Sequence, residues 1–246
     1  MRPEDRLAED PTLRQGLSVA VTRLGLLLPP GAEDRLLAFL DQLLRWNRVF
    51  NLTAIRDPAM ALTQHLVDCL ATVVPIDRRL SARQSGLSGQ PAILDVGSGG
   101  GLPGVVLAIA RPQWTLWCVD SVAKKTSFVQ QAAAELDLQN VTAVHGRVQD
   151  LSLREGGFDA IISRAFSSLD EFASLTKRHL AQSGEWVAMK GQHPEAELSA
   201  MAAEHQVFHV EPLQVPGLDA QRCLVWMRPA RASTDIPQPG RHLNPR

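Results

Sequence analysis

A glycine-rich segment that begins with an acid is the part of this chain whose residues and spacing most clearly indicate chemistry. It runs Asp95-Val96-Gly97-Ser98-Gly99-Gly100-Gly101-Leu102-Pro103-Gly104 and directly follows the apolar pair Ile93-Leu94. Glycine tolerates positive φ and lets backbone approach a ligand closely, and the apolar run 105–110 predicts a helix whose N-terminus faces the loop. A strand, a glycine turn and a helix in this order are typical of a nucleoside or nucleotide site.

Two classes of ligand use such a turn, and the segment fits the pattern of both. Asp-x-Gly-x-Gly-x-Gly begins at Asp95, whereas Gly-x-Gly-x-x-Gly begins at Gly99. A dinucleotide loop cradles a pyrophosphate, beside which a carboxylate is electrostatically unfavourable. S-adenosylmethionine carries an ammonium and a sulfonium and no phosphate, so Asp95 favours this methyl donor. A dinucleotide site and purely structural glycines stay open as alternatives.

A second acid supports a nucleoside ligand. Asp120 ends the strand-like run 115–119, about 20 residues beyond the glycine loop, where a carboxylate can accept hydrogen bonds from both ribose hydroxyls. Since both ligand classes contain a ribose, Asp120 does not separate them. We expect Gly99 and Asp120 to bind the cofactor.

Composition restricts the class of protein. The chain has 246 residues, 45% of them hydrophobic, so it can bury one large α/β core with a small appendage. Its three cysteines, Cys69, Cys118 and Cys223, are odd in number and lack C-x-x-C spacing, so neither a disulfide nor a metal site is expected. No apolar run approaches the roughly 20 residues of a membrane span, and the acidic N-terminus is unlike a signal peptide. We expect a cytoplasmic monomer with no membrane partner.

The net charge of −1 shows that the whole chain lacks the basic character of a general nucleic-acid binder. Any contact with nucleic acid must therefore be local. Most isolated basic side chains are simply solvated, but those that follow strands are more informative. The local basic groups are Arg45, Arg48, Arg56, Lys124, Lys125, Arg147, Arg164, Lys177, Arg178 and Lys190.

The elements that must position these residues alternate along the chain. Helices are expected over 33–47 and from Asp57-Pro58 onward, followed by a polar loop over 77–92. Strands are then expected over 93–96, 115–119, 141–145, 158–163 and 186–189, with helices over 103–110, 123–136, 168–181 and 194–204 between or after them. Two further strand-like runs, 207–213 and 222–227, are close enough to form a hairpin.

This alternation predicts an α/β fold: a Rossmann-like, mostly parallel sheet with an antiparallel C-terminal hairpin and an N-terminal helical cap. We divide the chain into a cap and linker over 1–92, a core over 93–228 and a flexible tail over 229–246. Ligands of such sheets bind beyond the carboxyl ends of the strands, which predicts one rim of functional side chains. Its members are Asp95, Asp120, Arg147, Arg164 and Lys190.

Several motifs together resemble the bacterial RsmG (GidB) family over roughly residues 32–228. Besides the glycine loop they are Trp46-Asn47-Arg48-Val49-Phe50-Asn51-Leu52-Thr53, Asp120-Ser121-x-x-Lys124-Lys125, Gly146-Arg147-Val148, Ile162-Ser163-Arg164-Ala165-Phe166 and Met189-Lys190-Gly191-Gln192. The resemblance implies a class I S-adenosylmethionine-dependent methyltransferase that modifies N7 of a guanine, conventionally guanine 527, in the 530 loop of 16S ribosomal RNA. It implies that the donor is held at Gly97, Leu102, Val148, Gln149 and Arg164, although many relatives have Glu where this chain has Gln149.

The residues fit this reaction independently. Guanine N7 is an exposed lone pair that loses no proton on methylation, so the transfer needs alignment rather than a general base. Adenine amino methylation usually draws on an Asn/Asp-Pro-Pro-aromatic turn, in place of which this chain has Ser163-Arg164-Ala165-Phe166. Carbon methylation of a pyrimidine needs a cysteine nucleophile, and none is expected after the fourth strand or near Lys190.

We assign roles on this basis. Arg164 is expected at the donor site and against a flipped base, and Lys190 at a phosphate or the base, although Lys190 can also be a solvated strand-end lysine. Lys124, Lys125, Arg147 and Lys190 are the expected RNA contacts. His65, on the apolar side of its helix, is expected to be a buried, hydrogen-bonded residue rather than a catalytic one. The scattered charge favours the assembled small ribosomal subunit over free RNA as substrate.

Overall fold

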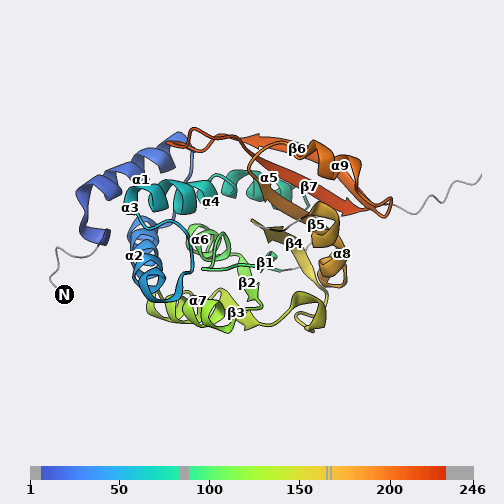
Figure 1. Cartoon of the computed structure of the whole chain (residues 1–246), viewed down its shortest axis with the longest axis horizontal. Coiled ribbons are helices and arrows are strands. Elements are labelled where there is room, and N and C mark those ends of the chain that lie inside the picture. The colour runs from blue at the N-terminus through green and yellow to red at the C-terminus, as the bar shows by residue number, and fades with distance from the viewer. Residues whose placement is uncertain (1–6, 84–88, 165, 167, 231–246) are drawn as a thin grey trace, which may run out of the picture.

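Seven strands form one sheet in the structure, a computed structural model that describes residues 7–83, 89–164, 166 and 168–230 (Figure 1). Their spatial order is β3-β2-β1-β4-β5-β7-β6. Strands β1 to β5 pair in parallel, whereas β7 pairs antiparallel with β5 and β6. The predicted parallel sheet with an antiparallel end is confirmed. The strands are β1 Ala92–Val96, β2 Thr115–Asp120, β3 Val141–His145, β4 Phe158–Ser163, β5 Leu180–Lys190, β6 His205–Leu213 and β7 Arg222–Pro229.

Helices cover both faces of this sheet. Short 3-10 turns lie at η2 Leu7–Glu9, η5 Val148–Asp150 and η6 Lys177–His179, and η3 Leu62–Val67 is π-helical. The α-helices are α1 Pro11–Arg23, α2 Ala32–Phe50, α3 Pro58–Ala61, α4 Asp68–Leu70, α5 Val73–Arg83, α6 Gly104–Ala110, α7 Ala123–Glu135, α8 Leu169–Thr176 and α9 Glu195–Ser199.

Alternation along the strands separates the core into two layers. Ile93 packs in the cluster that contains the buried faces of α1, α2, α6 and α7, whereas its neighbour Leu94 packs with Phe172 of α8. Successive side chains of a strand point to opposite faces, and all five residues of β1 are buried. In Figure 1, α2, α6 and α7 lie to the left of the sheet and α8 to its right. The N-terminal helices therefore share one hydrophobic core with the sheet.

The helical run Pro58–Arg83 corrects one expectation. It is 26 residues long, with a mean hydropathy of 1.4 in its most apolar window, and is apolar enough to cross a membrane by length and composition alone. The expectation that no such run exists is wrong. However, 72% of that window is buried inside the fold, and Leu66, Leu70 and Val73 are inaccessible to solvent. The run is a core helix that packs against the sheet layer.

Two N-terminal elements differ from the prediction. Helix α1 was not expected, yet Asp10 caps it by accepting from Thr12 N and Leu13 N with Pro11 in the first turn. The same Asp-Pro signal predicted the helix that begins after Asp57, so it could have found α1.

The loop expected over 77–92 is helical as far as Arg83, where α5 ends. Its polar residues suggested a loop because their partners lie far away in sequence. Arg79 and Arg83 both form ion pairs with Glu185 of β5, while Ile76 and Leu80 face the core.

Elements late in the chain have shifted bounds. The helix expected over 168–181 ends at Thr176, and β5 begins at Leu180 instead of residue 186 because it gains an irregular pairing with the start of β4. Helix α9 ends at Ser199, well before residue 204. Strand β7 continues to Pro229, and residues 231–246 of the expected tail lie outside the described residues.

Asn47 fixes the segment between α2 and α3. Its side chain is buried, with Nδ2 donating to Ile55 O at 3.1 Å and Oδ1 accepting from Thr53 N at 2.8 Å. Helix α2 ends at Asn51, whose φ of 50° is left-handed, a conformation that asparagine tolerates better than most residues. The segment 51–57 therefore has a defined shape despite having no secondary structure over most of its length.

This segment and α2 pack directly on the glycine loop. A Cβ on Gly100 would lie 2.6 Å from Leu43 Cδ1 and 4.0 Å from Leu52 Cβ. Trp46 packs on Phe128 of α7, with ring centroids 5.4 Å apart, so its ring is part of the contact between α2 and α7. The cap therefore helps to shape the loop.

We predict that Asn47→Ala lowers the free energy of unfolding by about 2 kcal/mol, because two backbone groups of the segment lose their buried partner. Urea unfolding followed by circular dichroism measures this, with Gln130→Ala on the exposed face of α7 as control. Equal unfolding midpoints for the two variants would contradict the structural role of Asn47.

Candidate nucleoside-binding site

The carboxyl ends of the parallel strands bring the predicted site residues to one edge of the sheet. Asp120 and Lys190 are the last residues of β2 and β5, and Arg164 directly follows β4. Arg147 lies two residues beyond β3, and Asp95 is the next-to-last residue of β1. Since all five strands are parallel, these side chains share the edge at which ligands of such sheets bind.

Backbone N–H groups hold the glycine loop onto the end of β2. The N–H groups of Gly97 and Ser98 both donate to Val119 O, at 2.9 and 3.1 Å, and Gly99 N donates to Asp120 Oδ2 at 2.9 Å. Gly97 and Gly99 have φ values of 69° and 57°, which glycine adopts without steric strain. A Cβ added to Gly97 would meet nothing within 4 Å. The loop thus presents open backbone to a ligand.

Asp95 ties the start of α6 to β1. The residue is completely buried, and its Oδ2 accepts a hydrogen bond from Gly104 N at 2.8 Å. Burial raises the pKa of this carboxyl to about 7, against the opposing effect of the Gly104 hydrogen bond. Its Oδ1 has no hydrogen-bond partner among the described residues. Asp95, whose charge suggested a cationic ligand, therefore binds the backbone of its own loop through Oδ2.

Asp120 is held in the same way. Its Oδ2 accepts from Gly99 N and its Oδ1 accepts from Val122 N at 2.9 Å, while Lys125 Nζ lies 3.7 Å from Oδ2. An ionised carboxylate has about four lone-pair sites, so Asp120 can still accept two hydroxyl groups. The adjacent lysines therefore differ in their surroundings. Lys125 forms an ion pair with Asp120, whereas Lys124 is exposed.

The turn after β3 lies next to the end of β2, because β3 pairs with β2. Val148 is buried, and its carbonyl oxygen lies 2.8 Å from His179 Nε2. The carbonyl of Gln149 accepts from Arg178 Nη1 at 3.0 Å. Because a carbonyl can only accept, Nε2 of His179 carries the proton. These two side chains of η6 fix the backbone of the turn, while Arg147 beside it is exposed.

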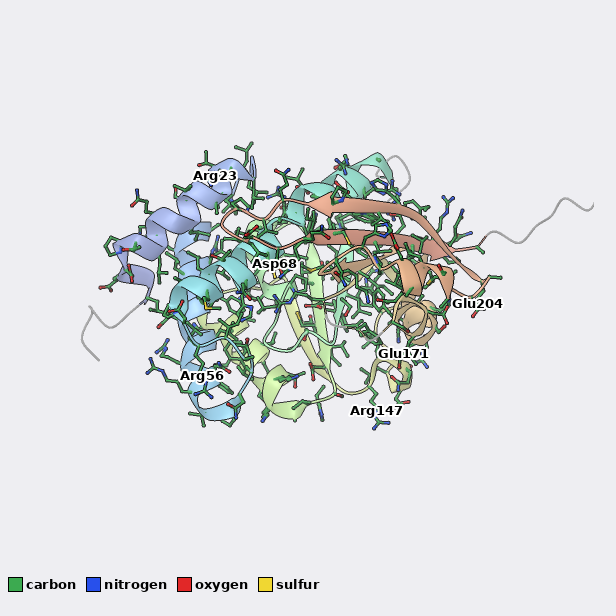
Figure 2. The ribbon with its side chains drawn as sticks, turned by 45° about the horizontal axis from the view of Figure 1, so that its top comes forward. Arg23, Arg56, Asp68, Arg147, Glu171 and Glu204 are labelled. Carbon is green, nitrogen blue, oxygen red and sulfur yellow. The ribbon has the colours of Figure 1, made fainter. Side chains whose placement is uncertain are left out.

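Arg164 turns from β4 toward the N-terminal helices. Its Nη1 donates to Gln64 O at 3.1 Å and lies 3.8 Å from Asp68 Oδ2. Asp68 also accepts from Arg222 Nε of β7 at 3.0 Å through Oδ1. Figure 2 shows Asp68 inside the molecule, between the helices and the sheet. One buried acid on the cap therefore joins the ends of two strands, and the sequence analysis missed it.

His65 extends this network to the segment after α2. Its Nδ1 lies 3.1 Å from Gln64 O, an obligate acceptor, so Nδ1 carries the proton and Nε2 accepts from Thr53 Oγ1 at 2.8 Å. Burial lowers the pKa of His65 to about 4, with Arg164 adding to the effect. His65 is neutral at pH 7 and hydrogen-bonded at both nitrogens, as favoured from the sequence.

Lys190 is paired rather than free. Its Nζ lies 2.8 and 2.9 Å from the two carboxylate oxygens of Glu197, and Glu197 also accepts from Leu169 N at 2.9 Å. The segment 190–197 lines an open cavity of about 700 Å³ beyond β5. Glu197 has no motif around it that marks a partner for Lys190, so the pair could not be found from sequence.

The expectation that no cysteine lies near Lys190 is wrong. Cys223 stands opposite Lys190 in the pairing of β5 with β7, because the hairpin brings residues distant in sequence together. Burial raises the pKa of this thiol, and its Sγ donates to Gln192 O at 3.5 Å. Cys223 is therefore a protonated thiol and a poor nucleophile.

Across the parts of the chain that the structure describes, no group of three or more His, Cys, Asp or Glu could hold a metal ion.

The family model and the most similar curated proteins indicate one family. The family described as rRNA small subunit methyltransferase G (GidB) matches residues 32–225. The chain is 50% identical over 223 residues to ribosomal RNA small subunit methyltransferase G of Bordetella avium, which covers 90% of this chain and 96% of that protein. It is 51% identical over 216 residues to the protein of the same name from Leptothrix cholodnii, covering 88% and 95%. A SAM dependent methyltransferase structure from Aquifex aeolicus is 17% identical with a TM-score of 0.46, covering 70% of this chain and 98% of that chain.

We predict that Asp95→Asn changes how stability depends on pH. The folded pKa of Asp95 is raised from 3.8 to about 7, so between these values the folded protein keeps a proton that the unfolded chain loses. The contribution of Asp95 to stability therefore falls as pH rises through this window, and Asn removes that fall. Urea unfolding of the ligand-free proteins measures this. The free energy of unfolding of the variant minus that of the wild type should increase with pH. A difference that is constant with pH would refute the raised pKa.

Proposed function

We propose that this chain, which belongs to the rRNA small subunit methyltransferase G family, transfers the methyl group of S-adenosylmethionine to N7 of a guanine in the 530 loop of 16S ribosomal RNA. The family match includes the glycine loop and every residue of the predicted rim. The observation that carries the proposal is the loop itself, which Asp95 and Asp120 hold and which is open in front of Gly97. An acid at this strand end suits a cationic nucleoside better than a pyrophosphate.

The residues present fit S-adenosylmethionine. Asp120 has acceptor capacity left for two ribose hydroxyls, and the positive-φ backbone of Gly97 and Gly99 has no side chain to block the ligand. We assign Leu102, Val148, Gln149 and Arg164 to the same site. Leu102 and Val148 are buried in the fold, and we assign their contacts with the donor to backbone atoms. The donor, when bound, supplies an electrophilic methyl group on a sulfonium centre.

The described groups around the edge suit a transfer that needs no base. His65 is neutral, but Thr53 occupies its lone pair, and burial raises the pKa values of Cys69, Cys118 and Cys223. Guanine N7 offers its own lone pair and gives up no proton. The task left to the protein is to align the base with the methyl group. We assign this positioning to Arg164 and Lys190.

Exposed cations beside the loop are proposed to hold the RNA. Lys124, in the first turn of α7, and Arg147, two residues beyond β3, are both exposed and suit phosphate contacts. Lys190 can contribute by interacting with both Glu197 and the RNA. Lys125 contributes less to RNA binding, because its charge is paired with that of Asp120. With a net charge of −1, affinity for naked RNA should be modest. We therefore propose the assembled small ribosomal subunit as substrate, for a monomeric enzyme in the cytoplasm.

We predict that the protein incorporates labelled methyl from S-adenosylmethionine into small ribosomal subunits that lack this modification, and that mass spectrometry finds the label in 7-methylguanosine. Subunits already carrying the modification serve as control and should accept no label. Label in another nucleoside would show that guanine N7 is not the acceptor. Binding of S-adenosylmethionine without methyl transfer would indicate that the protein binds the donor but is not an enzyme.

Variants at the rim separate donor binding from RNA positioning. Arg164→Ala should raise the Kd for S-adenosylmethionine about tenfold, the loss expected for one interaction with a charged group. Lys190→Ala should leave that Kd unchanged and raise the KM for subunits. Isothermal titration and initial rates measure the two effects. An unchanged donor Kd in Arg164→Ala would remove Arg164 from the donor site.

A further inference from the structure

A second cavity, of about 520 Å³, lies on the cap at the carboxyl end of α2. Its polar lining comes from Asp41, Arg45, Asn47, Arg48 and Arg56. We propose that this cavity, called here the arginine pocket, is a second RNA contact that binds the phosphate backbone of the substrate. The inference rests on the proposed function, since it names where that substrate is held away from the reacting base.

The balance of charge in the pocket favours an anion. Three arginines line it against one acid, and that acid, Asp41, pairs with Arg45 at 3.0 Å one helical turn away. The pair leaves the charges of Arg48 and Arg56 uncompensated within the lining. Asp57 is adjacent in sequence, but its Oδ1 caps α3 by accepting from Met60 N at 2.8 Å. Two guanidinium groups that share one concave surface suit phosphates, which they bind with paired N–H groups.

The contacts among the described residues do not account for both arginines. Arg48 forms no hydrogen bond or ion pair with any residue that the structure describes, and Arg56 makes only a long contact to Asn51 Oδ1 at 3.4 Å. Arg48 lies in the last turn of α2, where a cation is favoured by the helix dipole. Arg56 lies two residues before Pro58, the first residue of α3, at a helix end where the dipole disfavours a cation. A bound phosphate would compensate for that placement.

The pocket is rigid and close to the glycine loop. Asn47, at its floor, binds both Thr53 and Ile55 and so fixes the backbone on which Arg56 stands. Leu52 of the same segment packs toward Gly100 of the loop. A ligand held in the pocket is thereby placed relative to the donor site with little freedom. Ordering cost on binding is small when the binding groups stand on a fixed backbone.

The arginine pocket and the rim cations lie on different elements. Arg48 and Arg56 of the pocket belong to α2 and to the segment 51–57, whereas Lys124 lies in the first turn of α7 and Arg147 lies in the turn after β3. Figure 2 shows Arg56 and Arg147 toward the same lower border of the molecule, with Arg23 at its upper end. An RNA strand that presents its base to the loop can therefore be held through its phosphates at more than one place.

The test measures binding of the full chain to small ribosomal subunits that lack the modification, over a series of salt concentrations. The double variant Arg48→Ala, Arg56→Ala should bind about tenfold more weakly or worse, and its plot of log affinity against log salt should be shallower by about 1.5. The double variant Arg48→Lys, Arg56→Lys should keep most of the affinity and the slope, since lysine also neutralises phosphate. Arg23→Ala, an exposed arginine of α1, is the matched control and should behave as wild type.

Three outcomes would overturn the arginine pocket. Wild-type affinity and slope in the alanine double variant would show that the RNA does not contact it. Weaker binding with an unchanged slope would indicate a ribosomal protein as the partner. An equal loss in the lysine double variant would indicate that packing, not charge, is responsible. The proposed function is tested separately by methyl transfer from the wild-type chain, which can fail while the binding result stands.

Discussion

The site depends on two carboxylates whose hydrogen bonds go to the backbone of the glycine loop. Asp95 accepts from Gly104 N where α6 begins, and Asp120 accepts from Gly99 N in the middle of the loop. A hydrogen bond contributes about 0.5–1.5 kcal/mol when its acceptor is neutral and about 1.5–3 kcal/mol when its acceptor is charged. Both acids stand on strands inside the sheet, so the loop takes its shape from the most rigid part of the molecule. Preorganised backbone is what an alignment-driven transfer needs.

The N-terminal helices belong to this arrangement because charge as well as apolar packing joins them to the sheet. Asp68 contacts Arg164 at the end of β4 and Arg222 of β7, and it is almost completely buried. Removing one member of such a network leaves an uncompensated buried charge, which is costly. The cap cannot tilt without breaking both contacts, so Arg164 and the cap keep a fixed relation. The position of Arg164 at the edge of the sheet is therefore fixed by Asp68 of the N-terminal helices.

Local signals in the sequence predicted the strands well, since an apolar run with a turn at each end is itself local. Asp10-Pro11 carried a signal of the same kind for α1, so that omission was avoidable. The polar stretch from Asp77 to Arg83 was not recognisable as helix, because Glu185, which pairs with two of its arginines, is about a hundred residues away. The neighbours of Lys190 were hidden for the same reason, since only strand pairing brings Cys223 beside it.

Net charge describes this chain incompletely, because it sums the buried ion pairs and the exposed charges without saying where each of them lies. Asp68 and Glu185 each pair with two arginines at contacts between the helices and the sheet. The charges that matter to RNA are the exposed ones around the loop. They are few, so each phosphate contact must be placed accurately, and a structured ribosomal particle can present phosphates at fixed positions better than a flexible strand. A near-neutral composition and a specific RNA substrate are therefore compatible.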